Sequence, residues 1–181
     1  ISNKIKWYHL PNPKTKINNI SIIKKNLYSK IETAVSRQMI SDVPIGAFLS
    51  GGLDSSTIAY FAKKIKPSID CFSINIMDSQ DPGVINDLPY AKKMANYLNL
   101  KLNIIEINSQ KMSQEVQKMI YSLDEPLSDP AALNVHFITK LSRENGIKVL
   151  LSGSGGDDIF SGYSRHKALK IYNILRLLPT S

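Results

Sequence analysis

Residues 48–56 (FLSGGLDSS) constrain the fold of this chain more than any other stretch. Here a short apolar run is followed by a Ser-Gly-Gly loop and then by the start of a predicted helix. Residues 43–49 are few, apolar and closed by glycines, which predicts a strand buried on both faces rather than a helix. Gly51 and Gly52 let the backbone turn tightly and bring its N–H groups close to an anion. The start of the following helix adds unpaired N–H donors and the positive end of its dipole. The stretch therefore predicts a phosphate-binding loop.

Three hydroxyls and one carboxylate complete this loop. Ser50, Ser55 and Ser56 can donate hydrogen bonds to phosphate oxygens. Asp54 cannot bind phosphate directly, so its expected role is to hold a Mg²⁺ that does. The alternative is a plain strand-to-helix turn with a carboxylate at the helix start. A Walker A loop is excluded, because its Gly-Lys-Ser/Thr ending is absent.

Size and charge narrow the class of protein. The 181 residues are enough for one α/β domain with a core, and 43% hydrophobic with 21% charged residues is typical of a globular chain. The formal charge of +8 raises the question of nucleic acid, but the lysines are scattered in ones and twos with no dense block. We therefore expect no nucleic-acid partner.

The sequence also predicts a cytoplasmic protein without a membrane partner. No apolar run approaches the roughly 18 to 20 residues that span a bilayer, and the N-terminal residues have no signal-peptide core. The single cysteine, Cys71, falls in a predicted strand and has no internal disulfide partner, which agrees with a reducing compartment. We expect it to be buried and inert.

Strands and helices alternate along the chain after a proline- and asparagine-containing linker at 1–20, and we assign 21–181 to one domain. Strands are predicted at 43–49, 71–76, 101–107 and 148–151. Apolar periodicity predicts helices near 27–40, 58–65, 90–98, 116–123 and 133–141, with polar loops at 78–87 and 123–130. This order predicts a doubly wound parallel sheet with helices on both faces.

A second glycine loop follows the fourth predicted strand, over residues 152–158 (SGSGGDD). Ligands of such sheets bind beyond the carboxyl ends of the strands, where the winding reverses. If the first and fourth strands are neighbours there, both glycine loops face one crevice. Asp54 and Asp157 would then meet as a Mg²⁺ pair around a polyphosphate.

The two glycine loops, the Leu-Asp-Glu-Pro segment at 123–126 and their order resemble the synthetase domain of glutamine-dependent asparagine synthetase, from about residue 27 to 163. Residues 50–56 match the family's SGGLDSS, and 151–163 match its LSG-D/E-G-G/S-D-E-x-F-x-G-Y signature. The first loop resembles the pyrophosphate loop (PP-loop) of ATP-pyrophosphatases, which implies an adenine nucleotide alpha hydrolase-like fold. NAD, GMP and tRNA-lysidine synthetases share such a loop but lack the second signature.

The resemblance implies that ATP and Mg²⁺ activate the side-chain carboxylate of aspartate as an acyl-adenylate, with release of pyrophosphate. Ammonia from glutamine then displaces AMP. By position, the adenosine contacts would be Leu49, Ile74, Ser152 and Gly153. The pyrophosphate contacts would be Ser50, Gly51, Gly52, Ser55 and Ser56, and the Mg²⁺ ligands Asp54 and Asp157, the latter also a catalytic candidate.

Ser154 is the sharpest departure from the family pattern, because it stands where the family carries Asp or Glu as the acid/base group. A serine hydroxyl cannot exchange a proton near neutral pH. We expect adenylate formation to be spared and amide formation to be slowed, unless Asp124 or Glu125 substitutes. Asp158, where the family has Glu, is either a helix N-terminal charge or a ligand. His136, His166 and Tyr163 have expected structural roles.

The family's other parts would lie outside this chain. The resemblance implies a glutaminase domain with an N-terminal cysteine nucleophile before residue 1 and a mostly helical portion after residue 181, and it is compatible with a homodimer of the whole enzyme. Two alternatives stay open from the sequence. One is the same chemistry on another carboxylate or sugar acceptor, and the other is a nucleotide-binding module without turnover.

Overall fold

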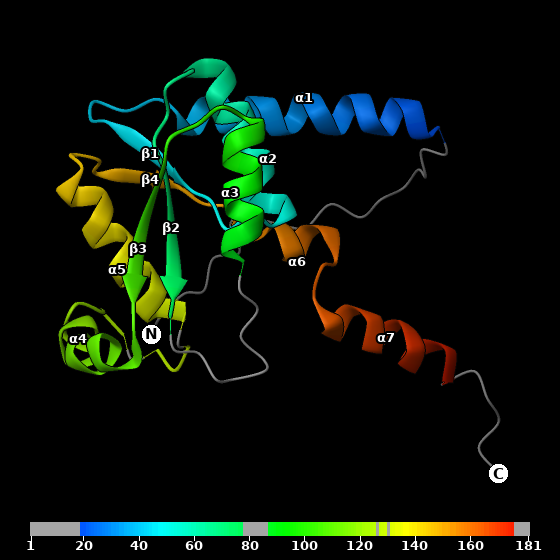
Figure 1. Ribbon diagram of the computed structural model, residues 1–181. Coiled ribbons are helices and arrows are strands. Elements are labelled where there is room, and N and C mark those ends of the chain that lie inside the picture. The colour runs from blue at the N-terminus through cyan, green and yellow to red at the C-terminus, as the bar shows by residue number, and fades with distance from the viewer. Residues whose placement is uncertain (1–18, 78–86, 126, 130, 176–181) are drawn as a thin grey trace, which may run out of the picture.

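Four parallel strands form one sheet in the order β3-β2-β1-β4 (Figure 1). The computed structural model describes residues 19–77, 87–125, 127–129 and 131–175. The strands are β1 (Ile45–Phe48), β2 (Cys71–Ile76), β3 (Leu102–Ile107) and β4 (Val149–Leu151). Since β2 and β3 lie on one side of β1 and β4 on the other, the winding of the chain reverses between β1 and β4.

Helices cover both faces of the sheet. One hydrophobic core joins β1 and β2 to α1 (Ile20–Gln38), α2 (Leu53–Ile65) and α3 (Leu88–Tyr97). On the opposite face, α4 (Ser109–Tyr121) and α5 (Ala131–Glu144) pack on β1, β2 and β3 through two further cores. This arrangement confirms the predicted doubly wound parallel sheet with helices on both faces.

The first strand shows how the alternation of side chains divides the two cores. Ile45 and Ala47 are buried against α1–α3, whereas Phe48 packs on the α5 side. Gly46 also faces the α5 side, where an added Cβ would come within 2.8 Å of the Phe72 ring and 2.9 Å of the Asp70 carbonyl oxygen. A side chain at this position would displace the central aromatic residue of the sheet, so the strand needs glycine there.

The first helix begins earlier than its apolar pattern predicts. Asn19 caps it, because its side-chain oxygen accepts hydrogen bonds from the backbone N–H groups of Ser21 (3.0 Å) and Ile22 (3.2 Å). Ile20 and Ile23 in the first turn are exposed. Leu27, where the sequence predicts that the inward face begins, is exposed as well, and the face that packs on the core begins at Ile31. Asn19 and Ile20 thus belong to α1 and its cap, and the rest of the predicted linker, 1–18, lies outside the described residues.

Most other predicted elements agree with the structure. The predicted strand 71–76 coincides with β2, and the other three strands are shorter at their ends than predicted. Of the predicted loop 78–87, residues 78–86 lie outside the described residues. The short helix α6 (Gly156–Phe160) follows the second glycine loop as expected, but α7 (Ser164–Leu175) is not predicted. Figure 1 shows α7 extending away from the sheet, and its side chains Leu169 and Tyr172 are exposed.

None of the helices, as far as the structure describes them, is long and apolar enough to cross a membrane.

Candidate functional site

Both glycine loops leave the sheet at the point where its winding reverses. β1 and β4 pair in parallel with Ile45 opposite Val149 and Ala47 opposite Leu151, so their carboxyl ends lie level. The loop that begins at Ser50 therefore starts beside the loop that begins at Ser152. The adjacency of the first and fourth strands, stated from the sequence only as a condition, is met in the structure. The pairing creates the edge at which ligands of open α/β sheets bind.

The first loop turns at Gly51, which has a left-handed backbone conformation (φ +85°). A Cβ at this position would also collide with the backbone of Tyr90 and Ala91 at the start of α3 and lie 2.6 Å from the Tyr90 Cβ. Gly51 is therefore required by its conformation and by the close approach of α3. No local sequence pattern indicates that α3 rests on this loop.

Serine hydroxyls hold the first loop closed. The Ser50 hydroxyl lies 2.9 Å from that of Ser55, and the Ser50 backbone N–H donates to the Ser55 Oγ (3.3 Å). The Gly52 N–H donates to the Ser50 Oγ (3.3 Å), and the Ser55 hydroxyl reaches the Gly52 carbonyl oxygen (3.3 Å). Ser55 and Ser56 are buried under the loop, whereas Ser50 is exposed. Of the three serines, Ser50 is thus the one whose hydroxyl an entering phosphate meets first.

The helix that follows this loop starts without a side-chain cap. Its N-cap residue is Gly52, which offers no side chain to accept hydrogen bonds from the first turn of α2. The first-turn N–H groups of a helix have no partner within the helix itself. An anion at this position would take the place that a capping side chain occupies in other helices.

The second glycine loop packs directly on the start of α2. A Cβ on Gly153 would lie 2.8 Å from the Asp54 carbonyl carbon and 2.8 Å from the Ser55 nitrogen. A Cβ on Gly156 would overlap the Asp54 carboxylate itself. Both glycines therefore allow contact between the two loops that any larger residue would prevent. The loops form one continuous surface around Asp54.

Asp54 and Asp157 are the residues that the sequence predicts to hold a metal ion. The Asp54 carboxylate lies against Gly156, the residue before Asp157, and the Asp157 carboxylate lies against Gly162. Neither carboxylate has a hydrogen-bond or ion-pair partner among the described residues. Two unpaired carboxylates suit Mg²⁺, which binds one or two protein carboxylates and completes its octahedron with water and substrate phosphates. The described part of the chain has no group of three or more His, Cys, Asp or Glu side chains that could hold a metal ion.

Three of the predicted adenosine contacts, Leu49, Ser152 and Gly153, follow the ends of β1 and β4, whereas Ile74 lies within β2. Leu49 is only 1% exposed and belongs to the α1–α3 core, so a ligand could reach its backbone but not its side chain. Its N–H donates to the Phe72 carbonyl oxygen (2.9 Å), which ties the residue after β1 to β2. Ile74 is half-buried in β2 on the α4–α5 side. Ser152 and Gly153 continue from β4 as described above.

Among the described residues, the hydrogen bonds of Ser154 go to another serine and not to an ionisable side chain. Its side chain is exposed, its hydroxyl lies 2.8 Å from that of Ser152, and its N–H donates to the Ser152 Oγ (3.1 Å). Asp124 and Glu125 instead line a separate groove of about 450 Å³ with Ile120, Leu123, Leu127 and Ser128. Ser154 does not line this groove, so the structure does not bring either carboxylate to it.

Asp158 and three residues near the start of α7, Tyr163, Arg165 and His166, contact one another. The Arg165 guanidinium donates to the Asp158 carboxylate (2.8 Å) and lies over the Tyr163 ring, 3.9 Å from its centre. The His166 ring packs near the same tyrosine, at 5.6 Å between centres. Asp158 is therefore engaged in an ion pair at the junction of α6 and α7, and Asp157 is the unpaired member of the two.

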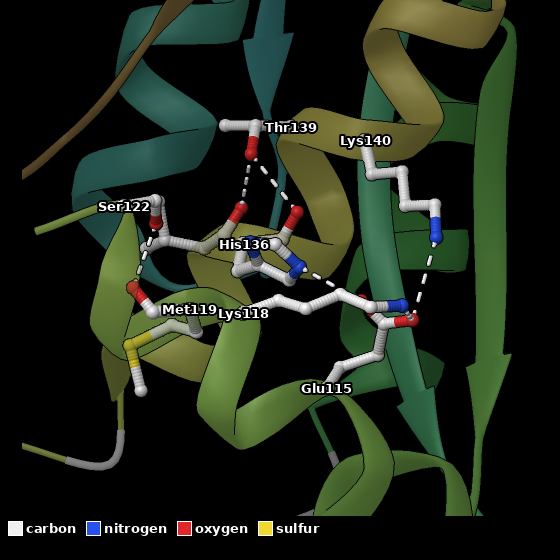
Figure 2. Close-up of polar contacts among 8 residues, drawn as sticks. Glu115, Lys118, Met119, Ser122, His136, Thr139 and Lys140 are labelled. Atoms are coloured by element: carbon white, nitrogen blue, oxygen red, sulfur yellow. Dashed lines mark hydrogen bonds and ion pairs between the residues drawn. The ribbon is translucent and has the colours of Figure 1, made fainter.

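Cys71 and Glu115 are among the ionisable groups whose pKa values are clearly shifted. Complete burial, reinforced by the nearby charge of Asp70, raises the pKa of the Cys71 thiol to about 12. Hydrogen bonds from Lys118 and then from His136 lower the pKa of the Glu115 carboxyl to about 2. The Glu115–His136 contact joins α4 to α5 (Figure 2). The sequence shows only half of this cluster, since Glu115 and Lys118 are spaced as helix neighbours but His136 lies on another helix.

Comparison with known proteins gives consistent matches. The sequence model of the asparagine synthase family matches residues 26–179. Glutamine-hydrolyzing asparagine synthetase 1 of Bacillus subtilis (strain 168) is 35% identical over 143 residues, which are 79% of this chain and 22% of that protein. A putative glutamine-hydrolyzing asparagine synthetase 2 of Methanocaldococcus jannaschii is 31% identical over 181 residues, with 97% of this chain and 33% of that protein covered. The chain thus spans a third or less of these two curated relatives.

A solved structure supports the fold. The U34-tRNA thiolase NcsA of Methanococcus maripaludis, solved with its 4Fe-4S cluster, superposes with a TM-score of 0.51 at 16% identity. The match covers 81% of this chain and 53% of that chain. At this identity the likeness concerns the arrangement of strands and helices alone.

Proposed function

Because the chain belongs to the asparagine synthase family, we propose that it is the ATP-binding synthetase portion of a glutamine-hydrolysing asparagine synthetase. It activates the side-chain carboxylate of aspartate as an acyl-adenylate and prepares it for attack by ammonia. The observation that carries this proposal is the direct contact of the two glycine loops around Asp54, at the reversal point between β1 and β4. That geometry offers phosphate donors and metal-binding carboxylates on one surface.

The first loop would hold the pyrophosphate part of ATP. Backbone N–H groups at Gly51 and the uncapped start of α2 provide the donors, together with the exposed Ser50 hydroxyl. The Gly52 N–H, which donates to the Ser50 Oγ in the structure, would exchange that bond for one to phosphate. Ser55 and Ser56 support the loop from below and add hydroxyls when the loop opens its internal hydrogen bonds. The adenosine part would lie on the Leu49 backbone, Ile74 and the start of the second loop at Ser152 and Gly153.

Asp54 and Asp157 would hold Mg²⁺ on the phosphates. Held by these two carboxylates, Mg²⁺ would supply positive charge against the negative charge of the pyrophosphate leaving group. The role of the protein is to present two carboxylates that no described residue neutralises and to keep Asp54 in place against Gly156.

The reaction proceeds in two displacements. A carboxylate oxygen of aspartate attacks the α-phosphorus, the bond from that phosphorus to the α–β bridging oxygen breaks, and pyrophosphate leaves with the bonding electrons. The loop N–H donors stabilise the charge that develops on the leaving group. Ammonia then attacks the acyl carbon, AMP leaves, and a proton is lost from nitrogen. Ser154 stands where a carboxylate would take this proton, so we propose that the first displacement is supported by this chain better than the second.

The parent protein would supply the remaining parts. We propose that residues 21–181 form part of the synthetase domain, that 1–20 connect it to a glutaminase domain, and that the complete enzyme is cytoplasmic and can form a homodimer. The chain's share of its relatives' length supports a parent that is several times longer.

The test is pyrophosphate exchange into ATP by the full-length parent protein, with aspartate and a panel of other carboxylic acids. Exchange with aspartate alone is the expected result. Exchange with one other acid but not with aspartate would show that this other acid is the acceptor. Absence of exchange with every acid, despite confirmed ATP binding, would overturn the synthetase function in favour of a binding module.

A further inference from the structure

The helix α6 is not held in place by the hydrophobic core. None of its five residues is buried, and the side chains of Ile159 and Phe160 are 76% and 55% exposed. The helix that follows it, α7, extends away from the sheet (Figure 1). Asp157 lies in the first turn of α6, so core packing does not fix the place of its carboxylate. That place depends on contacts close to the helix itself.

The chain that leaves α6 folds back onto Asp157. Ser161 has a left-handed backbone conformation (φ +61°), which is uncommon for a residue other than glycine. The backbone N–H of Ser161 and that of Gly162 (2.9 Å) both donate to the Asp157 carbonyl oxygen. Because α6 is only five residues long, this closing turn brings Gly162 back beside the first turn of the helix.

The Asp157 carboxylate occupies the space that a side chain at position 162 would need. A Cβ on Gly162 would overlap a carboxylate oxygen of Asp157 and lie 2.8 Å from its carboxyl carbon. The backbone of Gly162 does not have a left-handed conformation, so its φ angle does not require glycine. The close approach of Asp157 is therefore the reason for glycine here. By lying so close, the Gly162 backbone limits the rotamers that the carboxylate can adopt.

The other predicted metal ligand is supported in the same way, since the Asp54 carboxylate lies against the backbone of Gly156. Each of the two carboxylates thus rests on a glycine that stands later in the chain. Neither glycine has the left-handed conformation that would by itself explain its presence.

The carboxylate next to Asp157 is held differently. Asp158 accepts a hydrogen bond from Arg165 (2.8 Å), and the side chains of Arg165 and Asp158 are 63% and 59% exposed. Solvent screens an ion pair of this kind, so it contributes little to the position of α6. Its loss would alter the junction of α6 and α7 without adding any atom to the space between Gly162 and Asp157.

We propose that Gly162 is a positioning residue for the carboxylate of Asp157 as a magnesium ligand. This inference rests on the proposed function, in which Asp54 and Asp157 hold Mg²⁺ on the phosphates of ATP. Gly162 acts through Asp157 alone, because its bare backbone leaves room for the carboxylate and limits its rotation. Mg²⁺ demands nearly ideal octahedral geometry, so a displaced carboxylate binds it less tightly.

The experiment measures the affinity of the full-length parent protein for ATP by calorimetric titration, with and without Mg²⁺. Gly162→Ala places a methyl group where the carboxylate lies, Asp157→Ala removes the carboxylate, and a double variant carries both changes. In the double variant the carboxylate is gone and the new methyl group lies 3.2 Å from the Cβ of residue 157, a contact that a small shift accommodates. Arg165→Ala is the matched control at the same junction.

We expect Gly162→Ala to weaken the binding of ATP about tenfold in the presence of Mg²⁺ and to leave binding without Mg²⁺ unchanged. Asp157→Ala should cause at least as large a loss. Adding Gly162→Ala to Asp157→Ala should cause no further loss, because the glycine acts through that carboxylate. Arg165→Ala should leave both affinities unchanged.

Hydrogen exchange of the backbone amides at positions 161 and 162, measured without ligands, separates positioning from a structural role. Both amides should stay as protected in Gly162→Ala as in the wild type, because only a side chain is displaced. Faster exchange there, or failure of Gly162→Ala to fold, would show a structural role and overturn the proposal.

The binding data distinguish the remaining outcomes. An additive loss in the double variant, or an equal loss in Arg165→Ala, would overturn the proposal. A loss in Asp157→Ala without one in Gly162→Ala would overturn the positioning role alone and leave the proposed function intact. If Asp157→Ala binds ATP and Mg²⁺ as the wild type does, the metal role of Asp157 in the proposed function is wrong, and the positioning role is wrong with it.

Discussion

The carboxylate of Asp54 lies so close to the backbone of Gly156 that a Cβ on the glycine would overlap a carboxylate oxygen. The two residues belong to different glycine loops, and the backbone of Gly156 does not have the left-handed conformation that marks Gly51 or Gly155. Close approach to Asp54 is therefore the reason for glycine at this position. The side chain of one loop and the backbone of the other form a single fitted surface.

Gly156→Ala is predicted to displace the Asp54 carboxylate and weaken the magnesium-dependent binding of ATP about tenfold, because the added methyl group occupies its place. Calorimetric titration of ATP with and without Mg²⁺ measures the effect. The control is Gly146→Ala in the turn after α5, where a Cβ meets open space but the conformation is left-handed (φ +75°). It should cost stability without changing ATP affinity. Unaltered magnesium dependence in Gly156→Ala would contradict the fitted arrangement.

Asp54→Asn is predicted to weaken ATP binding in the presence of Mg²⁺ and to leave binding without Mg²⁺ nearly unchanged. An amide keeps the shape of the side chain but removes the charge that attracts the cation. Titrations of the wild-type and variant chains, each with and without Mg²⁺, separate the two contributions. If the wild-type chain binds ATP equally well with and without Mg²⁺, and Asp54→Asn has no effect, then Asp54 does not bind the metal.

Ser154→Asp is predicted to accelerate amide formation in the full-length parent protein while pyrophosphate release stays the same. A positioned carboxylate can accept the proton from the attacking nitrogen, and such groups contribute about 10²- to 10⁴-fold. Pyrophosphate and amide are measured separately in one reaction mixture. If both rates match those of the wild type, proton transfer does not depend on this position.

The contribution of Glu115 to stability is predicted to vanish in acid. The folded protein holds the pKa of Glu115 at about 2, below its ordinary value of 4.5, mainly through the hydrogen bond from Lys118. A depressed pKa stabilises the fold fully above pH 4.5, and that stabilisation is lost as the pH falls toward 2. The difference in unfolding free energy between wild type and Glu115→Gln, measured by urea denaturation, should be constant near neutral pH and shrink in this range. A difference that does not vary with pH would show that Glu115 acts through shape alone.

Cys71 is predicted to be unreactive in the folded protein, and the chain should release no ammonia from glutamine. The thiol is fully buried, and burial raises its pKa to about 12 from an ordinary 9.0, so almost no thiolate is present at neutral pH. By the same linkage, the fold should lose stability as the pH rises above 9.0. Titration with a thiol reagent should show reaction only after denaturation. Native-state modification at the denatured rate, or ammonia release above a Cys71→Ser control, would contradict this assignment.

Local patterns and connection rules account for the features that the sequence predicts correctly. The strand 71–76 is visible because its buried residues and turn signals are adjacent in the chain, and β2 has the same bounds. The alternation of strands and helices likewise predicts a parallel sheet, because parallel strands need crossover connections. The order of the elements does not by itself determine that β1 and β4 are neighbours, which the repeated glycine loop only suggests.

Contacts between distant segments account for the features that the sequence does not predict. Nothing in the spacing around residue 90 indicates that Tyr90 and Ala91 press on Gly51, because this contact depends on how α3 crosses the sheet. The Glu115–His136 contact likewise depends on the packing of α4 against α5. The first turn of α1 is not predicted, because the isoleucines that follow the capping Asn19 are exposed and do not continue the buried face of the helix. The roles of the individual site residues remain predictions.

The pairing of β1 with β4 also determines when the site can form. More than half of the chain lies between Ile45 and Val149, so this pairing closes a long loop and is slow compared with the formation of any single helix. Before this pairing forms, Gly153 and Gly156 do not contact Asp54, and the two loops cannot bind one ligand together. A nucleotide that needs both loops would therefore bind only chains that have finished folding, and its binding would report the completion of the sheet.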